Sequence, residues 1–116
     1  MSHLSILEYE LIDFFGSDFV SRQFGTEWFD SDSLYRYEDA EGMVITCAIH
    51  PIHKDARVTL SFQSHTYFDW QATGLADIIY EGDARQLRFV TPAGDALELR
   101  LIPKILVSHS YPFRPE

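Results

Sequence analysis

Histidines and a single cysteine are the residues whose spacing comes nearest to a metal or nucleophile site. His50 and His53 form an H-x-x-H pair around Pro51, and His65 follows further along the chain. A zinc site needs two such histidines to converge with another ligand, and the sequence supplies no clear third ligand here. Cys47 and His50 have an odd spacing, which directs them to opposite faces of a strand. We therefore predict a buried, unreactive Cys47 and no metal site.

Paired carboxylates are the other candidates for chemistry. Asp30 lies close to Asp32 in sequence, and Asp39 lies close to Glu41. Acid–base catalysis needs a pocket that separates the pKa values of two such groups, but these residues fall in segments that we expect to be solvated turns. Glycine-rich phosphate loops and a G-x-S-x-G serine motif are absent from the sequence. The sequence thus predicts no catalytic residues, no cofactor and no enzymatic activity.

Negative charge is concentrated in the first third of the chain. Residues 1–41 hold ten acidic and two basic residues, so they carry −8 of the net charge of −9. Large aromatic residues are interleaved with these acids: Phe14, Phe15, Phe19, Phe24, Trp28 and Phe29. Aromatic side chains rimmed by charge, such as Trp28 between Glu27 and Asp30, are typical of protein interfaces. An acidic field suits a basic protein partner, whereas phosphate backbones would repel it, so we expect no direct nucleic-acid binding.

Length and composition are typical of one folded domain. A chain of 116 residues with 46% hydrophobic residues can bury a core, and we predict a single domain over residues 1–116. One cysteine fits a reducing compartment. Residues 1–15 lack the basic and apolar regions of a signal peptide, and no apolar stretch approaches the ~18 residues of a membrane span. These features predict a soluble, cytoplasmic protein without a membrane partner.

The N-terminal residues show a helical pattern. Apolar residues recur at spacings of three and four over Leu4, Leu7, Leu11, Phe14 and Phe15, which predicts a helix over residues 3–15. Ser2 or Ser5 could cap this helix; Ser5 and Glu8 have the spacing of a capping box, and Gly16 is suited to end the helix. Residues 17–24 could add a second short helix, and the run from Asp30 to Ser33 is expected to be a loop.

From Leu34 onward the hydrophobic period changes to two, which indicates strands. The predicted strands are Leu34–Asp39, Met43–His50, Ala56–Gln63, Thr66–Gln71, Leu75–Glu81, Gln86–Thr91 and Ala96–Val107. Pro103 cannot donate a hydrogen bond to a ladder, so we expect a bulge or a sheet edge near it. The tail from Tyr111 to Glu116 is expected to be irregular.

These elements predict an α+β fold in which the N-terminal helix packs on a curved, mostly antiparallel sheet of about six or seven strands. The helix should cover one face of the sheet. The alternation of apolar residues predicts a core that contains Leu7, Leu11, Phe14, Val58, Leu60, Phe62, Leu87, Phe89, Leu97 and Leu99.

A small acidic domain with one cysteine, the helix of residues 3–15, an acid-rich segment from Glu27 to Glu41 and a strand-rich remainder resembles bacterial toxin-immunity proteins, including those of contact-dependent growth inhibition systems. The resemblance implies a protein that binds and neutralises a basic toxin, often a nuclease, by covering its active site with acidic side chains. It further implies charged contacts from Glu27, Asp30, Asp32, Glu38, Asp39 and Glu41. Trp28 and Tyr35 would be the aromatic anchors.

Two other classes of function stay open from the sequence. A pocket between the helix and the sheet would indicate a small-molecule-binding or enzyme domain, with His50, His65, Tyr67 and Asp69 as its candidate polar residues. An exposed strand edge would suit a homo-oligomeric structural protein. The sequence gives no oligomeric state.

Overall fold

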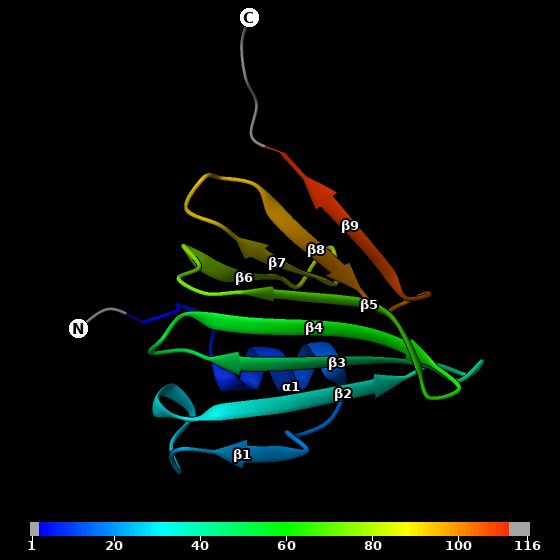
Figure 1. The fold of residues 1–116 in the computed structure, drawn as a ribbon, viewed down its shortest axis with the longest axis horizontal. Helices are drawn as coiled ribbons and strands as arrows, with labels where there is room; N and C mark the ends of the chain where they lie inside the picture. Colours follow the sequence, from blue (N-terminus) through cyan, green and yellow to red (C-terminus); the bar gives the residue numbers. More distant parts are fainter. Residues whose placement is uncertain (1–2, 112–116) are drawn as a thin grey trace, which may run out of the picture.

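A computed structural model describes residues 3–111, and within them the chain forms one α-helix, α1 (Glu8–Phe15), and nine strands in two antiparallel sheets (Figure 1). The five-stranded sheet has the order β1 (Ser21–Gln23), β2 (Asp32–Glu38), β3 (Met43–His50), β4 (Asp55–Phe62) and β5 (His65–Ala72). The four-stranded sheet has the order β6 (Asp77–Glu81), β7 (Gln86–Val90), β8 (Ala96–Arg100) and β9 (Leu106–Ser110). A short 3-10 helix, η1 (Trp28–Asp30), precedes β2. The α+β class and the N-terminal helix are confirmed, but the single curved sheet is wrong because the strands divide into two sheets.

Alternating side chains give the five-stranded sheet one apolar face. On β3, Ile45, Cys47 and Ile49 are buried, whereas the residues between them are half-buried. Cys47 lies opposite Val58 of β4, and Ile49 lies opposite Ala56. All these side chains point to the same side of the sheet because residues two apart on a strand share a face. The predicted burial of Cys47 is confirmed.

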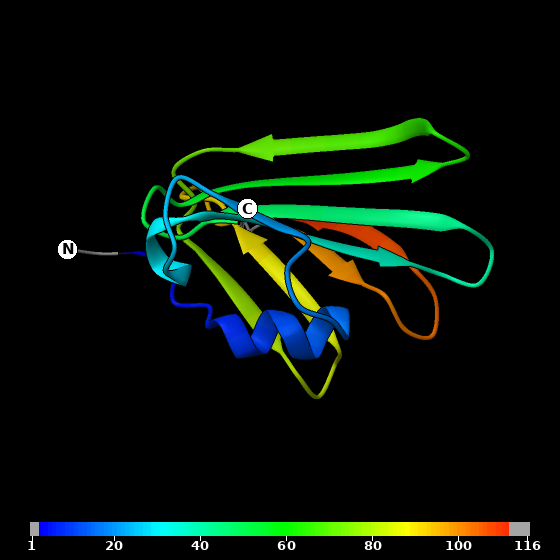
Figure 2. The ribbon, with the colours of Figure 1, turned by 90° about the horizontal axis from the view of Figure 1, so that it is seen from below.

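The opposite face of this sheet is polar. The hydroxyl groups of Thr46 and Thr59 form a hydrogen bond between β3 and β4. Arg57 donates two hydrogen bonds to the carboxylate of Asp69 on β5, from Nε at 3.0 Å and from Nη2 at 2.7 Å. Figure 2 shows α1 and the second sheet on the other side, so no described element covers this polar face.

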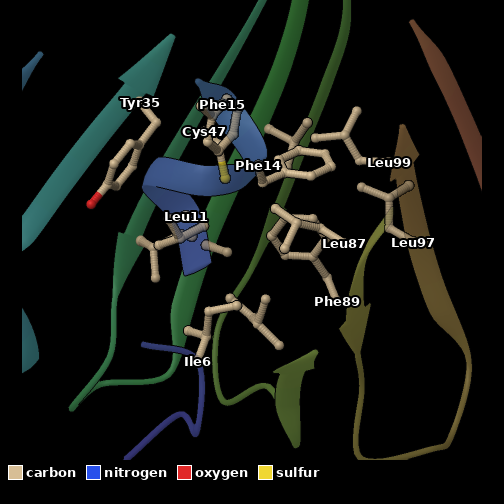
Figure 3. Packing of buried hydrophobic residues seen from close by; sticks show 14 of the residues in the cluster. Ile6, Leu11, Phe14, Phe15, Tyr35, Cys47, Leu87, Phe89, Leu97 and Leu99 are labelled. Atoms are coloured by element: carbon tan, nitrogen blue, oxygen red, sulfur yellow. The ribbon is translucent and has the colours of Figure 1, made fainter. Parts of the chain in front are cut away.

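The second sheet supplies the other half of the core. Leu87 and Phe89 of β7 pair with Leu99 and Leu97 of β8, and all four side chains are buried. They belong to one cluster with the buried residues of α1 and of the first sheet, which Figure 3 shows from close by. Phe14 extends from α1 toward the second sheet, so the helix joins the two sheets.

The structure divides the long predicted strand Ala96–Val107 into two. β8 ends at Arg100, the chain reverses through Pro103, and β9 returns to pair Val107 with Leu99. A proline has no backbone N–H to donate to a continuing ladder, which accounts for the interruption. The result is a turn rather than the predicted bulge, with β9 at the edge of the sheet.

The helix begins later than its apolar pattern predicts. Leu7 is the N-cap residue, and its backbone N–H donates to Glu10 Oε1 at 2.9 Å. Gly16 ends the helix as predicted, with φ of 75° and its N–H donating to the carbonyl of Ile12 at 2.8 Å. Within residues 3–111, no helix is long and apolar enough to cross a membrane.

A contact with a distant strand overrides the predicted cap at Ser5. The Ser5 backbone N–H donates to Asp77 Oδ1 at 2.8 Å, and its hydroxyl donates to Asp77 Oδ2 at 2.6 Å. Ser5 is therefore held at the start of β6, and residues 3–7 do not form a first helical turn. This shift buries Leu4 and Ile6 and leaves Leu7 with 47% of its surface exposed, so the predicted core position of Leu7 is wrong.

Other core predictions are confirmed with two exceptions. Leu60 and Phe62 are half-buried, and Leu60 packs against the buried cluster without being part of it. The buried residues that were predicted are Leu11, Phe14, Val58, Leu87, Phe89, Leu97 and Leu99.

Residues 17–24 contain the short strand β1 (Ser21–Gln23) rather than the second helix suggested by the sequence. β1 pairs with the start of β2, with Ser21 opposite Leu34. The Arg22 side chain fixes this edge strand, because its Nε donates to Ser33 Oγ at 2.8 Å and its Nη2 lies 3.3 Å from Glu8 Oε2. The other predicted cap, Ser2, and residues 112–116 of the predicted tail lie outside the described part of the chain.

Candidate functional site

Strand β2 separates the predicted acidic residues into two groups. Glu27, Asp30 and Asp32 lie at or before the start of β2, whereas Glu38, Asp39 and Glu41 lie at its end and in the β2–β3 turn. Strands rise about 3.3 Å per residue, so Asp32 and Glu38 are roughly 20 Å apart. The structure therefore does not bring the predicted acidic residues into one patch.

The group at the β2–β3 turn is engaged in local structure. Asp39 Oδ1 accepts hydrogen bonds from the backbone N–H groups of Glu41 and Met43, each at 2.9 Å, and so stabilises the turn. Glu38 accepts a hydrogen bond from Arg36 Nη2 at 2.7 Å. Of this group, Glu41 is exposed and its side chain forms no ion pair within residues 3–111.

In the group at the start of β2, Asp30 and Asp32 border a hollow of about 480 Å³, whereas Glu27 is exposed and does not line it. We call it the Asp32 groove, and it is lined by Phe24, Asp30, Asp32, His50, Ile52, His53 and Asp55. A smaller hollow of about 260 Å³ continues from it over the end of the five-stranded sheet and shares Asp32, His50 and Asp55. The groove thus unites residues from the β1–η1 loop, from η1 and from the ends of three strands.

Backbone hydrogen bonds hold the β3–β4 turn against η1. The N–H of Ile52 donates to the carbonyl of Phe29 at 3.1 Å, and the N–H of Leu4 donates to the carbonyl of Pro51 at 3.0 Å. Lys54 closes the turn with φ of 58° and a hydrogen bond from its N–H to Pro51 at 3.3 Å. This docking places the histidine-bearing turn beside the acidic residues of η1 and β2.

No cation of the described residues pairs with the carboxylates of the Asp32 groove. Asp30, Asp32 and Asp55 form no ion pair and accept no side-chain hydrogen bond from the described residues. Asp30 Oδ1 is buried and has no hydrogen-bond partner there. Several other acids pair with arginine or histidine, among them Glu8, Glu38, Asp69, Glu98 and Asp95. The groove therefore concentrates carboxylates that the fold leaves without partners.

The histidines of the groove lie on each other. The imidazole rings of His50 and His53 stack with centroids 4.1 Å apart and planes inclined by 24°. Across the described residues, no group of three histidine, cysteine or acidic side chains has the arrangement of a metal site. The H-x-x-H pair thus provides a planar surface in the groove wall.

Tyr35 is not the exposed anchor that the resemblance implied. Its side chain is fully buried and stacks on Phe15, with ring centroids 5.4 Å apart. Burial, followed by the nearby charge of Glu8, raises the pKa of its phenol above the ordinary range. The alternation on β2 places Tyr35 on the core face, so this residue supports the fold (Figure 3).

Trp28 also contacts the core. It is half-buried, its indole Nε1 donates to the carbonyl of Ile6 at 3.3 Å, and its ring meets Tyr35 edge-on. The aromatic side chains that are open to solvent in this region are Phe24, with 81% of its surface exposed, and Phe29, with 45% exposed. The sequence pattern placed all these aromatic residues in one acidic segment, but it did not show which of them would be buried in the core.

A third hollow, of about 380 Å³, lies between the end of α1 and the second sheet. Its lining includes Asp13, Phe14, Tyr80, Arg85 and Ile102. The hydroxyl of Tyr80 donates to Asp13, and this hydrogen bond raises the pKa of Tyr80 to about 12. A hollow between helix and sheet was an alternative from the sequence.

The residues proposed for that alternative lie elsewhere. His65 and Tyr67 are exposed on the edge strand β5, and Asp69 pairs with Arg57 on the polar face. His50 lines the Asp32 groove instead. Cys47, the other candidate for chemistry, is fully buried, and burial raises the pKa of its thiol, which keeps it in the unreactive neutral form.

Sequence reasoning missed Phe24, Ile52 and Asp55 as members of the candidate site. One signal for Asp55 was present, because a β3–β4 hairpin with a four-residue turn places Asp55 opposite His50. The proximity of this turn to Asp30 and Asp32 depends on the contact between Ile52 and Phe29, for which the sequence carried no signal.

The fold resembles that of a solved structure. A chain of the "Contact-dependent growth inhibition toxin - immunity protein complex from Klebsiella pneumoniae 342" superposes with a TM-score of 0.72 at 18% sequence identity, over 95% of this chain and 98% of that chain. No model of a protein family matches the sequence, and a search of curated proteins gives no match. The similarity therefore establishes a shared fold with a component of a toxin–immunity complex.

Proposed function

We propose that this chain is an immunity protein, which binds a toxin and neutralises it. The observation that carries the proposal is the similarity of nearly the whole chain to a chain of a contact-dependent growth inhibition toxin–immunity complex. Charge supports the role of inhibitor, because a net charge of −9 suits association with a basic protein. The resemblance inferred from the sequence leads to the same class of protein.

The finer parts of this proposal concern the toxin and the cell. We propose that the partner is a basic nuclease whose substrate-binding surface attracts phosphate and would also attract the carboxylates of the Asp32 groove. A bacterial cytoplasmic location follows from this role, since an immunity protein must meet the toxin where the toxin acts. The buried free thiol of Cys47 is compatible with such a reducing compartment.

The test starts from the gene next to the one that encodes this chain. The adjacent gene product is purified, its inhibition of cell growth is measured with and without co-expression of this chain, and the binding constant is determined. We expect stoichiometric binding and protection of the cells. A neighbouring product that inhibits growth and is neither bound nor neutralised would contradict the proposed function.

Charge variants then locate the contact surface. Asp32→Asn combined with Asp55→Asn removes charge from the groove, and Glu38→Gln combined with Glu41→Gln removes the same charge from the β2–β3 turn. We expect the first pair to slow association more, and the difference to shrink as salt rises, because exposed charges are screened over about 8 Å at 0.15 M. A larger effect of the second pair would place the interface at the turn.

Small-molecule binding is the second candidate, and the hollow between α1 and β6 is the observation that favours it. Arg85 would give that hollow a cation for an acidic ligand. Thermal unfolding in the presence of a panel of small carboxylates tests this alternative. A concentration-dependent rise in midpoint that Arg85→Gln abolishes would support it, and equal midpoints throughout would argue against it.

A further inference from the structure

We propose that the Asp32 groove receives an arginine side chain of the toxin. This inference rests on the proposed function and specifies which chemical group of the partner enters the groove. Three carboxylates, two stacked imidazole rings and one exposed phenyl ring line the same hollow. This combination fits a planar cation that forms hydrogen bonds along its edges and packs through its faces.

The carboxylates supply the charge and the hydrogen-bond acceptors. Asp30, Asp32 and Asp55 come from η1, β2 and β4, and no described cation neutralises any of them. The Oδ1 of Asp30 is buried beside Gly25, so the acceptors that an N–H group of a ligand can reach are the carboxylates of Asp32 and Asp55, which line both hollows. Arginine carries five such N–H donors and stays charged at all relevant pH values.

Among residues 3–111, the cations nearest to the groove do not line it. Arg57 lines only the adjoining smaller hollow, and its guanidinium is held by two hydrogen bonds to Asp69. Lys54 belongs to the same turn as His53 but is not among the residues that line the groove. An incoming cation therefore meets unneutralised carboxylates.

The rings favour arginine over lysine. A guanidinium group is planar and weakly hydrated, so it stacks on aromatic surfaces while its edges bind carboxylates, whereas an ammonium group is compact and strongly hydrated. Phe24 projects with 81% of its surface exposed from a position with φ of 67°, and the His50–His53 stack forms another planar wall. Arg22 over the Phe19 ring, at 3.9 Å, shows the same kind of contact within this chain.

A titration tests the groove without the toxin. The full-length, isotope-labelled protein is titrated with N-acetyl-arginine amide, and the neutral N-acetyl-citrulline amide serves as the matched control ligand. We expect saturable shifts of the His50 and His53 imidazole resonances with the arginine compound and none with the citrulline compound. Asp32→Asn with Asp55→Asn should abolish them, and Glu38→Gln with Glu41→Gln should preserve them. Absence of saturation, or equal response to both compounds, overturns the inference.

A double-mutant cycle tests the same contact in the complex. Each arginine of the toxin is changed to lysine, and each variant is measured against the wild-type chain and against the Asp32→Asn, Asp55→Asn variant. For one arginine, the change to lysine should lower the affinity of the toxin for the wild-type chain about tenfold and should not lower its affinity for the double variant further. A bidentate charged contact contributes about one or two factors of ten to affinity. If the toxin binds and no arginine shows this coupling, the groove assignment fails while the immunity function stands. If no toxin binds, the proposed function fails and the titration alone decides the groove.

Discussion

His50 of β3 lies opposite Asp55 of β4 at the last paired position of their ladder, where the alternation along both strands places the two residues on the polar face of the sheet. The pairing brings a carboxylate next to the stacked rings of His50 and His53. Two residues that a β-turn separates in sequence are thereby joined in one groove. The same groove is completed from the other side by Asp30 and Asp32.

Gly25 is expected to be required for the position of Asp30. A Cβ at residue 25 would lie 2.5 Å from Asp30 Oδ1 and 2.7 Å from the Asp30 carbonyl oxygen. Because such contacts force the loop to move, Gly25→Ala should cost about 1–3 kcal/mol in the free energy of unfolding. It should also weaken binding to the partner.

Gly82→Ala is the matched control, because its Cβ would meet Tyr80 at 3.6 Å, an ordinary van der Waals contact. Chemical denaturation of both variants checks the stability, and a binding assay checks the groove. Equal stability of the two variants would show that the loop around Gly25 adapts without cost.

The hydrogen bond between Tyr80 and Asp13 predicts a loss of stability at alkaline pH. Its effect raises the pKa of Tyr80 from the ordinary value of 10.0 to about 12 in the folded protein. The stabilisation is complete below pH 10.0, where the phenol is protonated in both states, and is lost toward pH 12, because the unfolded state then releases its proton first.

The measurement is the difference in unfolding free energy between the wild-type protein and Tyr80→Phe as a function of pH. This difference should fall across that interval, and Asp13→Asn should bring the pKa of Tyr80 down. A difference that stays constant over the interval would show that the two side chains are not coupled in solution.

Cys47 should react with thiol reagents only when the protein unfolds. Its side chain has no exposed surface, and burial disfavours the reactive thiolate. The labelling rate, followed by absorbance, is expected to be far below that of a free thiol in native buffer and to rise with denaturant. Fast labelling of the native protein would mean that the sheets open around β3, and Cys47→Ala controls for reaction at other sites.

The joint core of the two sheets predicts a large cost for Leu87→Ala. Leu87 is fully buried and pairs with Leu99, so its truncation should cost about 2–5 kcal/mol in the free energy of unfolding. Leu106→Ala is the matched control on the edge strand β9, where half the side chain is exposed, and should cost less than about 1 kcal/mol. Similar costs for the two variants would contradict the placement of the core.

Local alternation made most strands predictable, whereas the division into two sheets depended on contacts far apart in sequence. β3 was predicted with its observed bounds, because Ile45, Cys47 and Ile49 alternate with less buried residues. The first sheet ends with β5 at Ala72, and β6 begins the second sheet at Asp77. In the connection between them, the Leu75 N–H donates a hydrogen bond to the carbonyl of Lys54 at 2.9 Å. No local pattern marks that hydrogen bond.

The candidate site was partly predictable for the same reason. Asp30 and Asp32 were predicted as charged contacts, and the spacing of His50 and His53 is that of possible metal ligands. The four residues line one groove because the backbone of Ile52 is hydrogen-bonded to that of Phe29, a contact between segments distant in sequence. Tyr35 was assigned to the contact surface because alternation along a strand does not show which of its two faces will be buried in the core. The cap at Ser5 was misassigned because Asp77, distant in sequence, binds the same atoms.

The polar face of the five-stranded sheet has a consequence for how such a protein can change over generations. The carboxylates of the Asp32 groove make no hydrogen bond or ion pair that holds the described fold, and the buried cluster lies on the opposite face of the sheet. Substitutions of the Asp32 and Asp55 side chains should therefore cost little in folding free energy. Under the proposed function, recognition and stability would rest on different sets of residues, so each could vary while the other is kept.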